Sequence, residues 1–198
     1  MATSKREYKN TRRKTGQIFA LLLIGAGLMI FAVVAAVFLA DEGVSADSEN
    51  APQDLVIPAS VNYHAPDLKL SDLRGSNVAL TDYLGQVVLI NNWATWCPPC
   101  RAEMPTLQAY YEEHKDQGFT IIAIDAGDLA SDVSKFADEF GLTFPVWLDP
   151  NSDAIRAFRN NGLPSSYVLD RSGTVRLAWT GAISSNALEQ YVTPLIKE

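Results

Sequence analysis

The chain contains only two cysteines and two histidines among its 198 residues. Two cysteines are too few for a disulfide-rich scaffold, in which several bridges compensate for a small core. A metal site is also disfavoured, because His64 and His114 lack the paired spacing that zinc sites use. A c-type haem requires a histidine directly after the second cysteine, and Arg101 occupies that position. No nicotinamide or flavin fingerprint occurs either, so we expect no metal and no organic cofactor.

Basic residues are scarce outside the start of the chain. Residues 1–15 contain six of the 16 Lys and Arg residues and one acid, which leaves 10 basic against 22 acidic residues elsewhere. Nonspecific affinity for nucleic acid comes mostly from basic side chains that neutralise phosphates. The acidic part of the chain is therefore a poor binder of nucleic acid, and we expect no nucleic-acid partner.

One long apolar run, residues 18–40, contains 23 residues and no charge. As a helix it would be ~35 Å long, enough to span a hydrocarbon core of about 30 Å. Basic residues precede it, and Asp41 and Glu42 follow it. This charge pattern predicts a cytoplasmic segment at 1–17, a transmembrane anchor at 18–40 and an extracytoplasmic location for the remainder.

A cleaved signal peptide is the alternative for this run. Small residues at cleavage-like spacing, Val44-Ser45-Ala46, follow it. The apolar stretch is longer than the roughly 7–15 residues of a signal peptide, which favours a retained anchor. Since no cysteine directly follows the run, a lipoprotein is excluded. Residues 41–60 are acidic, small and proline-containing, which is typical of a flexible tether.

Residues 61–198 alternate between short apolar runs and segments with helical spacing. Such alternation, ending in a hairpin, predicts an α/β sandwich domain with a mixed central sheet and an N-terminal hairpin. The expected strands cover 65–70, 78–80, 87–93, 119–125, 146–148, 166–169 and 174–179, and the expected helices cover 98–115, 131–140, 153–159 and 184–196.

Both cysteines lie at the turn between the strand 87–93 and the helix that follows it, in the motif Cys97-Pro98-Pro99-Cys100. One helical turn brings the two sulfurs within bonding distance and places the first at a helix N-terminus, where a thiolate is favoured. The prolines suit the first turn, because their missing N–H groups have no intrahelical partner there. A purely structural disulfide would constrain little chain across a two-residue loop. The motif therefore predicts a redox-active pair with Cys97 as the attacking thiol and Cys100 as the resolving thiol.

Residues 87–105, VVLINNWATWCPPCRAEMP, resemble the active-site segment of the TlpA/ResA family, and the likeness extends from about His64 to Glu198. Members of this family are membrane-tethered thiol–disulfide oxidoreductases of bacteria with a thioredoxin-like fold. The resemblance implies a single-pass protein of the bacterial cell membrane with an extracytoplasmic catalytic domain. Its partners would be disulfide-containing extracytoplasmic proteins, such as apocytochrome c and its maturation factors, and a membrane thiol–disulfide electron donor. The only redox group would be the Cys97–Cys100 disulfide.

Glu103 lies three residues after Cys100, so the two side chains share a helix face. From spacing alone it is either a proton shuttle for Cys100 or a solvated surface acid, and the family resemblance favours the shuttle. We expect it to be largely exposed. Asn91 stands where thioredoxins commonly carry a buried Asp, so a buried base must come from elsewhere. Asn92 stands where relatives usually have Phe, and the sequence offers no explanation for it.

The resemblance also implies a substrate-binding rim around the cysteines. Trp96, Pro98 and Pro99 would shape the docking surface beside the sulfurs. Pro164 would be a cis-proline whose loop lies against the active cysteines. There the Leu163 backbone would pair with an extended segment of the substrate, as in β-strand addition.

Three other functions remain open from the sequence. The same chemistry serves an oxidant or isomerase that installs disulfides. A copper chaperone on this fold usually separates its cysteines by three residues and adds a later histidine, and no histidine follows His114. A peroxidase is disfavoured, because the expected context of a peroxidatic cysteine is missing. The two intervening prolines offer no N–H to Cys97, so only the helix dipole, the Cys100 N–H and Arg101 could stabilise its thiolate, which favours a reductant.

Overall fold

A computed structural model of the chain describes residues 56–198. The expected cytoplasmic segment 1–17, the expected anchor 18–40 and positions 41–55 of the expected tether lie outside the described residues. Within 56–198, no helix has both the length and the apolar character needed to cross a membrane.

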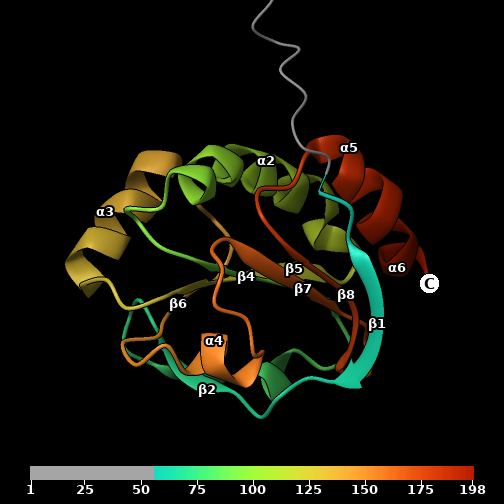
Figure 1. Cartoon of the computed structure of the whole chain (residues 1–198), viewed down its shortest axis with the longest axis horizontal. Helices are drawn as coiled ribbons and strands as arrows, with labels where there is room; N and C mark the ends of the chain where they lie inside the picture. Colours follow the sequence, from blue (N-terminus) through green and yellow to red (C-terminus); the bar gives the residue numbers. More distant parts are fainter. Residues whose placement is uncertain (1–55) are drawn as a thin grey trace, which may run out of the picture. The chain divides into compact units, whose positions relative to one another are not determined.

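Eight strands of the described region form one mixed sheet (Figure 1). They are β1 (Ala59–His64), β2 (Lys69–Asp72), β3 (Asn77–Ala79), β4 (Val87–Trp93), β5 (Phe119–Asp125), β6 (Val146–Leu148), β7 (Ser165–Leu169) and β8 (Thr174–Thr180). Their order is β1-β8-β7-β4-β5-β6-β2-β3. β4, β5 and β6 run parallel, whereas β7 is antiparallel to β4 and β8 to β7. This arrangement confirms the expected α/β class with a mixed sheet.

The centre of the sheet is buried on both faces. Every residue of β4 and of β5 is buried, in keeping with their mostly apolar sequences. Because side chains alternate between faces, Leu89 and Trp93 belong to one hydrophobic cluster, whereas Val88 and Ile90 belong to the other. The C-terminal end of β4 is thus held between two packed layers, and the cysteine motif follows this end.

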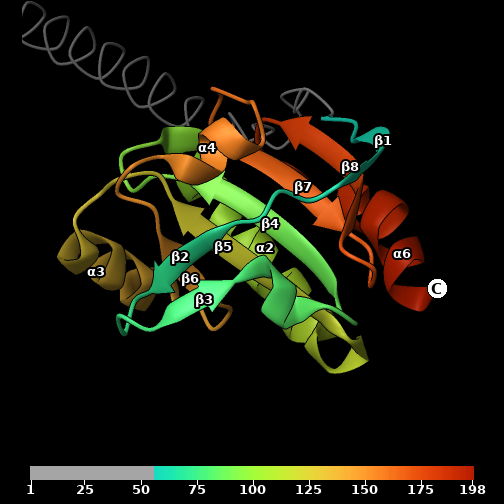
Figure 2. The ribbon, with the colours of Figure 1, turned by 90° about the horizontal axis from the view of Figure 1, so that it is seen from below.

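The helices divide between the two faces (Figures 1 and 2). They are α2 (Pro98–His114), α3 (Ala130–Phe140), α4 (Asp153–Ala157), α5 (Ser185–Ala187) and α6 (Thr193–Lys197). Residues of α2, α3, α5 and α6 contribute to the cluster that contains Trp93, whereas Ala154 of α4 contributes to the cluster that contains Ile90. Short 3₁₀ turns cover Leu80–Tyr83 and Lys115–Gln117.

Most element boundaries agree with the sequence-based expectations to within one residue, but three features differ. β1 was not expected, and its first two residues, Ala59 and Ser60, lie in the stretch expected to be a tether. The first strand of the expected hairpin begins at Lys69 rather than at position 65. The helix expected to end at 159 ends at Ala157.

The expected C-terminal helix is continuous but changes its winding. α5 passes into a π-helical segment, Leu188–Val192, and then into α6. Pro194 lies in the first turn of α6 and lacks the N–H that would bond the Gln190 carbonyl. The wider π turn ends at Val192, two residues before this proline.

Candidate active site

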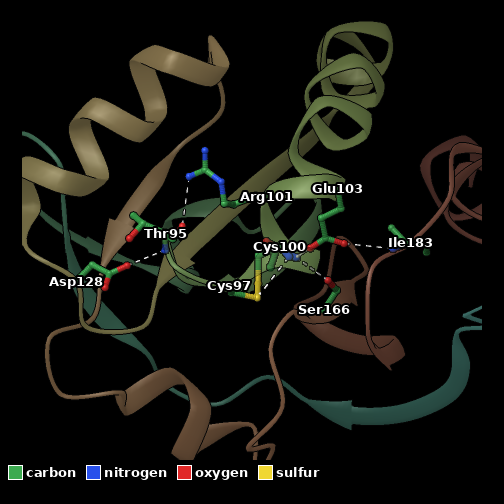
Figure 3. Close-up of a disulfide and its surroundings, with 9 residues drawn as sticks. Thr95, Cys97, Cys100, Arg101, Glu103, Asp128, Ser166 and Ile183 are labelled. Atoms are coloured by element: carbon green, nitrogen blue, oxygen red, sulfur yellow. Dashed lines mark hydrogen bonds between the residues drawn. A yellow bond between two sulfur atoms is a disulfide. The ribbon is translucent and has the colours of Figure 1, made fainter.

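Helix α2 begins at a disulfide between Cys97 and Cys100, with an S–S distance of 2.06 Å (Figure 3). Cys97 is the N-cap residue, and Pro98 and Pro99 occupy the first turn. The Cys100 N–H donates to the Cys97 sulfur at 3.4 Å, as expected. The Arg101 N–H, the other expected donor, instead bonds the Cys97 carbonyl oxygen at 3.1 Å. The helix N-terminus therefore offers one direct N–H to this sulfur.

The two cysteines differ slightly in exposure. Cys97 is 4% exposed and Cys100 is fully buried, which is the order expected for an attacking and a resolving thiol. Pro98 and Pro99 are exposed beside them. Trp96 is 68% exposed, whereas Trp93 is completely buried in the core. Trp96 therefore offers a large apolar surface next to the disulfide.

Glu103 is buried, with 2% of its surface exposed, so the expectation of a largely exposed acid is wrong. One carboxylate oxygen accepts a hydrogen bond of 2.8 Å from the Asn91 amide. The other accepts a hydrogen bond of 3.2 Å from the Ile183 N–H. Burial raises the pKa of Glu103 from 4.5 to about 7, and these two hydrogen bonds lower it only in part. A carboxyl group with this pKa, one turn from Cys100, is suited to exchange a proton at neutral pH.

Asn91 and Asn92 link β4 to β7 through opposite faces of the sheet. The Asn91 amide also donates to Ser166 Oγ at 3.0 Å, on the face that carries α2. Asn92 is buried on the other face, where its amide donates to Ser165 Oγ at 3.3 Å. A polar partner in β7 therefore accounts for a polar residue at position 92, which the sequence left unexplained.

The Leu163–Pro164 peptide bond is cis, as the family resemblance implied. Ser165, the next residue, pairs with Asn92 near the end of β4. The turn that contains Leu163 and Pro164 therefore lies at the end of the sheet where β4 ends and the cysteine motif begins. Leu163 is partly buried against the core, and the Pro164 carbonyl accepts a hydrogen bond of 2.9 Å from Gly181 N–H.

The Arg101 side chain does not reach the sulfurs, contrary to its expected role as a thiolate stabiliser. Its guanidinium donates to the Thr95 carbonyl at 3.3 Å and to Glu139 at 3.2 Å. It also lies over the rings of Phe136 and Phe140. Figure 3 shows this side chain directed away from the disulfide.

One group of possible metal ligands occurs among residues 56–198, formed by Glu113, His114 and Glu189. His114 is 4% exposed, and its two ring nitrogens contact Glu189 and Gln117. The cluster lies at the far end of α2, roughly 20 Å along the helix from the cysteines. These contacts give His114 a structural role at this end of the helix.

Three hydrogen-bond partners of the site were not predicted from the sequence. They are Ser166, which bonds Asn91, the Ile183 N–H, which bonds Glu103, and Asp128, which accepts a hydrogen bond of 2.7 Å from Thr95 N–H. A backbone donor 80 residues from Glu103 leaves no signal in the sequence. Asp128 could have been found, because it follows β5. The carboxyl ends of adjacent parallel strands meet at one sheet edge, where functional residues gather.

The chain resembles known proteins over this whole domain. A model of the AhpC/TSA family matches residues 61–178. The thiol-disulfide oxidoreductase ResA of Geobacillus thermodenitrificans is 38% identical over 133 residues, which cover 67% of this chain and 76% of that protein. The protein of the same name from Halalkalibacterium halodurans is 33% identical over 134 residues, covering 68% of this chain and 76% of that protein.

Solved structures give the same result for the fold. A thiol:disulfide interchange protein of the thioredoxin family from Chlorobium tepidum superposes with a TM-score of 0.63 at 26% identity. The match covers 70% of this chain and 99% of that one. The domain therefore has a thioredoxin-like fold. Together with the paired cysteines at the start of α2, these similarities show that the chain is a protein thiol–disulfide oxidoreductase and belongs to the AhpC/TSA family.

Proposed function

We propose that this protein is anchored in the bacterial cell membrane by residues 18–40 and reduces disulfides of partner proteins outside the cytoplasm. Partners of this kind include apocytochrome c and other proteins of cytochrome c maturation. Its electrons come from a membrane thiol–disulfide donor, which returns the Cys97–Cys100 pair to the dithiol after each turnover.

The environment of the Cys97 sulfur supports the proposal that the protein acts as a reductant. Within the described region, the hydrogen-bond donor to this sulfur is the Cys100 N–H at 3.4 Å, and the Arg101 guanidinium is engaged by Thr95 and Glu139. Both residues between the cysteines are prolines, which have no N–H to offer. A strong oxidant of this fold needs a highly stabilised thiolate, because that makes its reduced form favourable. The modest stabilisation seen here favours a reducing couple.

The exchange proceeds through two displacements. The Cys97 thiolate attacks one sulfur of the partner disulfide, forms a mixed disulfide and expels the other partner sulfur as a thiolate. The Cys100 thiolate then attacks the Cys97 sulfur, which closes the Cys97–Cys100 disulfide and releases the second partner thiolate. Two electrons pass from the dithiol to the partner, and the expelled thiolates take up two protons.

Glu103 supplies the proton transfer for the second displacement. Cys100 is fully buried, so its proton needs an acceptor inside the protein. Glu103 lies one helical turn further along α2, and its pKa of about 7 allows it to accept and release a proton at neutral pH. The Asn91 and Ile183 bonds hold the carboxylate in place for this step.

The partner binds at the rim formed by Trp96, Pro98, Pro99, Leu163 and Pro164. An extended segment of the partner adds to the Leu163 backbone, and its apolar side chains contact the exposed Trp96 ring. Backbone pairing is largely independent of sequence, so this mode suits an enzyme with several partners.

The redox state of the cysteine pair in growing cells tests the direction of electron flow. Cells are quenched with acid, and free thiols are labelled with a heavy maleimide reagent that slows migration on a gel. We expect most of the full-length chain to carry two labels, because a membrane donor keeps the pair reduced. A Cys97→Ser, Cys100→Ser double variant gives the unlabelled position. A pair found mainly as disulfide in these cells would contradict the proposed reductant function and favour the oxidant or isomerase.

The anchor and topology are tested separately with intact spheroplasts. Protease added outside should release a soluble fragment that begins near residue 50 and extends to residue 198. Protection of that fragment would contradict the extracytoplasmic location. A mature N-terminus near Asp47 would instead show that the apolar run is a cleaved signal peptide.

A further inference from the structure

The backbone of Thr95 is held from two sides by charged side chains. Its N–H donates to an Asp128 carboxylate oxygen at 2.7 Å, and its carbonyl accepts from the Arg101 guanidinium at 3.3 Å. Figure 3 shows Asp128 and Arg101 approaching Thr95 from different elements. Thr95 directly precedes Trp96 and Cys97. These two contacts therefore fix the backbone that carries the exposed Trp96 ring to the disulfide.

Asp128 is itself held by a second, fully buried acid. Asp125, at the end of β5, is 0% exposed, and its Oδ1 accepts hydrogen bonds from Asp128 N–H at 2.8 Å and Gly127 N–H at 3.2 Å. Its Oδ2 is buried and has no hydrogen-bond partner within the described part of the chain. Asp125 Oδ1 therefore fixes the backbone of Asp128 and so the side chain that reaches Thr95.

We infer that Asp128 is a positioning residue for partner docking: together with Arg101 it fixes Thr95 and so orients Trp96. Asp125 holds the backbone of Asp128, so the Asp128 carboxylate stays within reach of the Thr95 N–H.

This role predicts a selective effect on protein partners. The Cys97 sulfur is also held by the start of α2 and by Cys100 N–H, so its reactivity toward a small disulfide does not depend on Asp128. A protein partner contacts the Trp96 ring as well, so its reaction does depend on Asp128. The ratio of the two rates isolates docking, because the titrations of Cys97 and Glu103 act on both reactions and cancel. The inference applies to thiol–disulfide exchange in either direction.

The test uses the full-length chain, purified in mild detergent and fully reduced. Second-order rate constants are measured with insulin as the protein disulfide and with glutathione disulfide as the small one, from pH 6 to pH 8. Asp128→Ala removes the acceptor for Thr95. Asp132→Ala is the matched control, because it removes an acid at the partly exposed start of α3.

We expect Asp128→Ala to lower the insulin-to-glutathione rate ratio about tenfold at pH 6.5, the effect of one lost hydrogen bond to a charged group. Asp132→Ala should match the wild type throughout.

An equal loss with both substrates, or an unchanged ratio in Asp128→Ala, would overturn the positioning role. If Asp128→Ala does not fold, Arg101→Gln serves in its place, because it releases the other side of Thr95. That variant must then show the same selective loss, and a ratio equal to that of the wild type would refute the inference.

Discussion

The Asn91 amide donates a hydrogen bond of 2.8 Å to the Glu103 carboxylate across the interior of the domain. Both side chains are almost completely buried, and Asn91 Oδ1 has no hydrogen-bond partner within residues 56–198. A rotation of the amide would present this oxygen to a protonated Glu103. Asn91 can therefore donate a hydrogen bond to the charged carboxylate through its nitrogen and accept one from the neutral carboxylic acid through its oxygen. This property suits a group that must take up and release a proton.

Replacing Asn91 with Leu should raise the pKa of Glu103 further above 7. The Asn91 hydrogen bond favours the charged carboxylate, and its loss leaves burial opposed by the Ile183 N–H alone. The carbonyl stretching band of the protonated acid, followed by infrared spectroscopy against pH, measures the change. Ser166→Ala, which keeps the Asn91–Glu103 bond, is the control. A pKa that stays near 7 in Asn91→Leu would show that Asn91 does not tune this acid.

Replacing Glu103 with Gln should stabilise the fold at neutral and higher pH. The folded-state pKa is about 7 against an ordinary value of 4.5, so between these values the folded form holds a proton that the unfolded form has released. The free energy of unfolding of the wild type therefore falls as the pH rises through this range. The variant avoids this loss and should be more stable at pH 8 by about 2–3 kcal/mol, with no gain at pH 4.

Urea denaturation at both pH values measures this difference. Glu113→Gln, at an exposed position of the same helix, should leave the pH dependence of stability unchanged.

The same Glu103→Gln variant should exchange disulfides at least about tenfold more slowly, because the proton acceptor for Cys100 is lost. Wild-type exchange rates from pH 5 to pH 9 would rule out the proton-transfer role.

The two cysteine variants should fail at different steps. Cys97→Ser removes the attacking thiolate, so reduction of a protein disulfide should stop. Cys100→Ser should still attack but then accumulate as a mixed disulfide with the partner. Non-reducing gels and mass spectrometry after incubation with insulin distinguish these outcomes. If alkylation at neutral pH modified Cys100 in preference to Cys97 in the reduced protein, the assigned roles would be reversed.

Trp96 and Trp93 should respond very differently to replacement by Ala. Trp96 is 68% exposed, so its loss should change stability by less than about 0.5 kcal/mol while it slows the reduction of protein disulfides. Trp93 is fully buried against Phe136, and its loss should cost about 3–5 kcal/mol through the cavity it leaves. Thermal unfolding and insulin reduction measure both effects. If Trp96→Ala reduced insulin at the wild-type rate, the Trp96 ring would not be part of the docking surface.

The sequence was sufficient for the parts of the fold with a strong local pattern. β4 and β5 are mostly apolar runs bounded by turn residues, and their expected limits match the structure. α2 begins at the cysteine motif, and α3 ends at Gly141 in the left-handed conformation that favours glycine. β1 escaped prediction, because five of its six residues are exposed and it lacks an alternating apolar pattern.

The active site was predictable only where its chemistry is local. The spacing of Cys97 and Cys100 predicts their bond, because both belong to one helical turn. The burial of Glu103 depends on Ile183, 80 residues away, and no helical spacing contains that information. The direction of the Arg101 side chain depends likewise on Glu139 and on aromatic rings of α3. Tertiary contacts determine the burial and the direction of such side chains.

The equilibrium of the Cys97–Cys100 pair with glutathione tests the proposed reductant most directly. The full-length chain is incubated in glutathione buffers of defined ratio, and the fraction of dithiol is read after acid quenching and thiol labelling. The single direct N–H at the Cys97 sulfur and the absence of donors in the two prolines predict a moderately stabilised thiolate. The reduction potential should therefore lie below roughly −200 mV. A potential near about −120 mV, typical of a strong oxidant, would contradict the account.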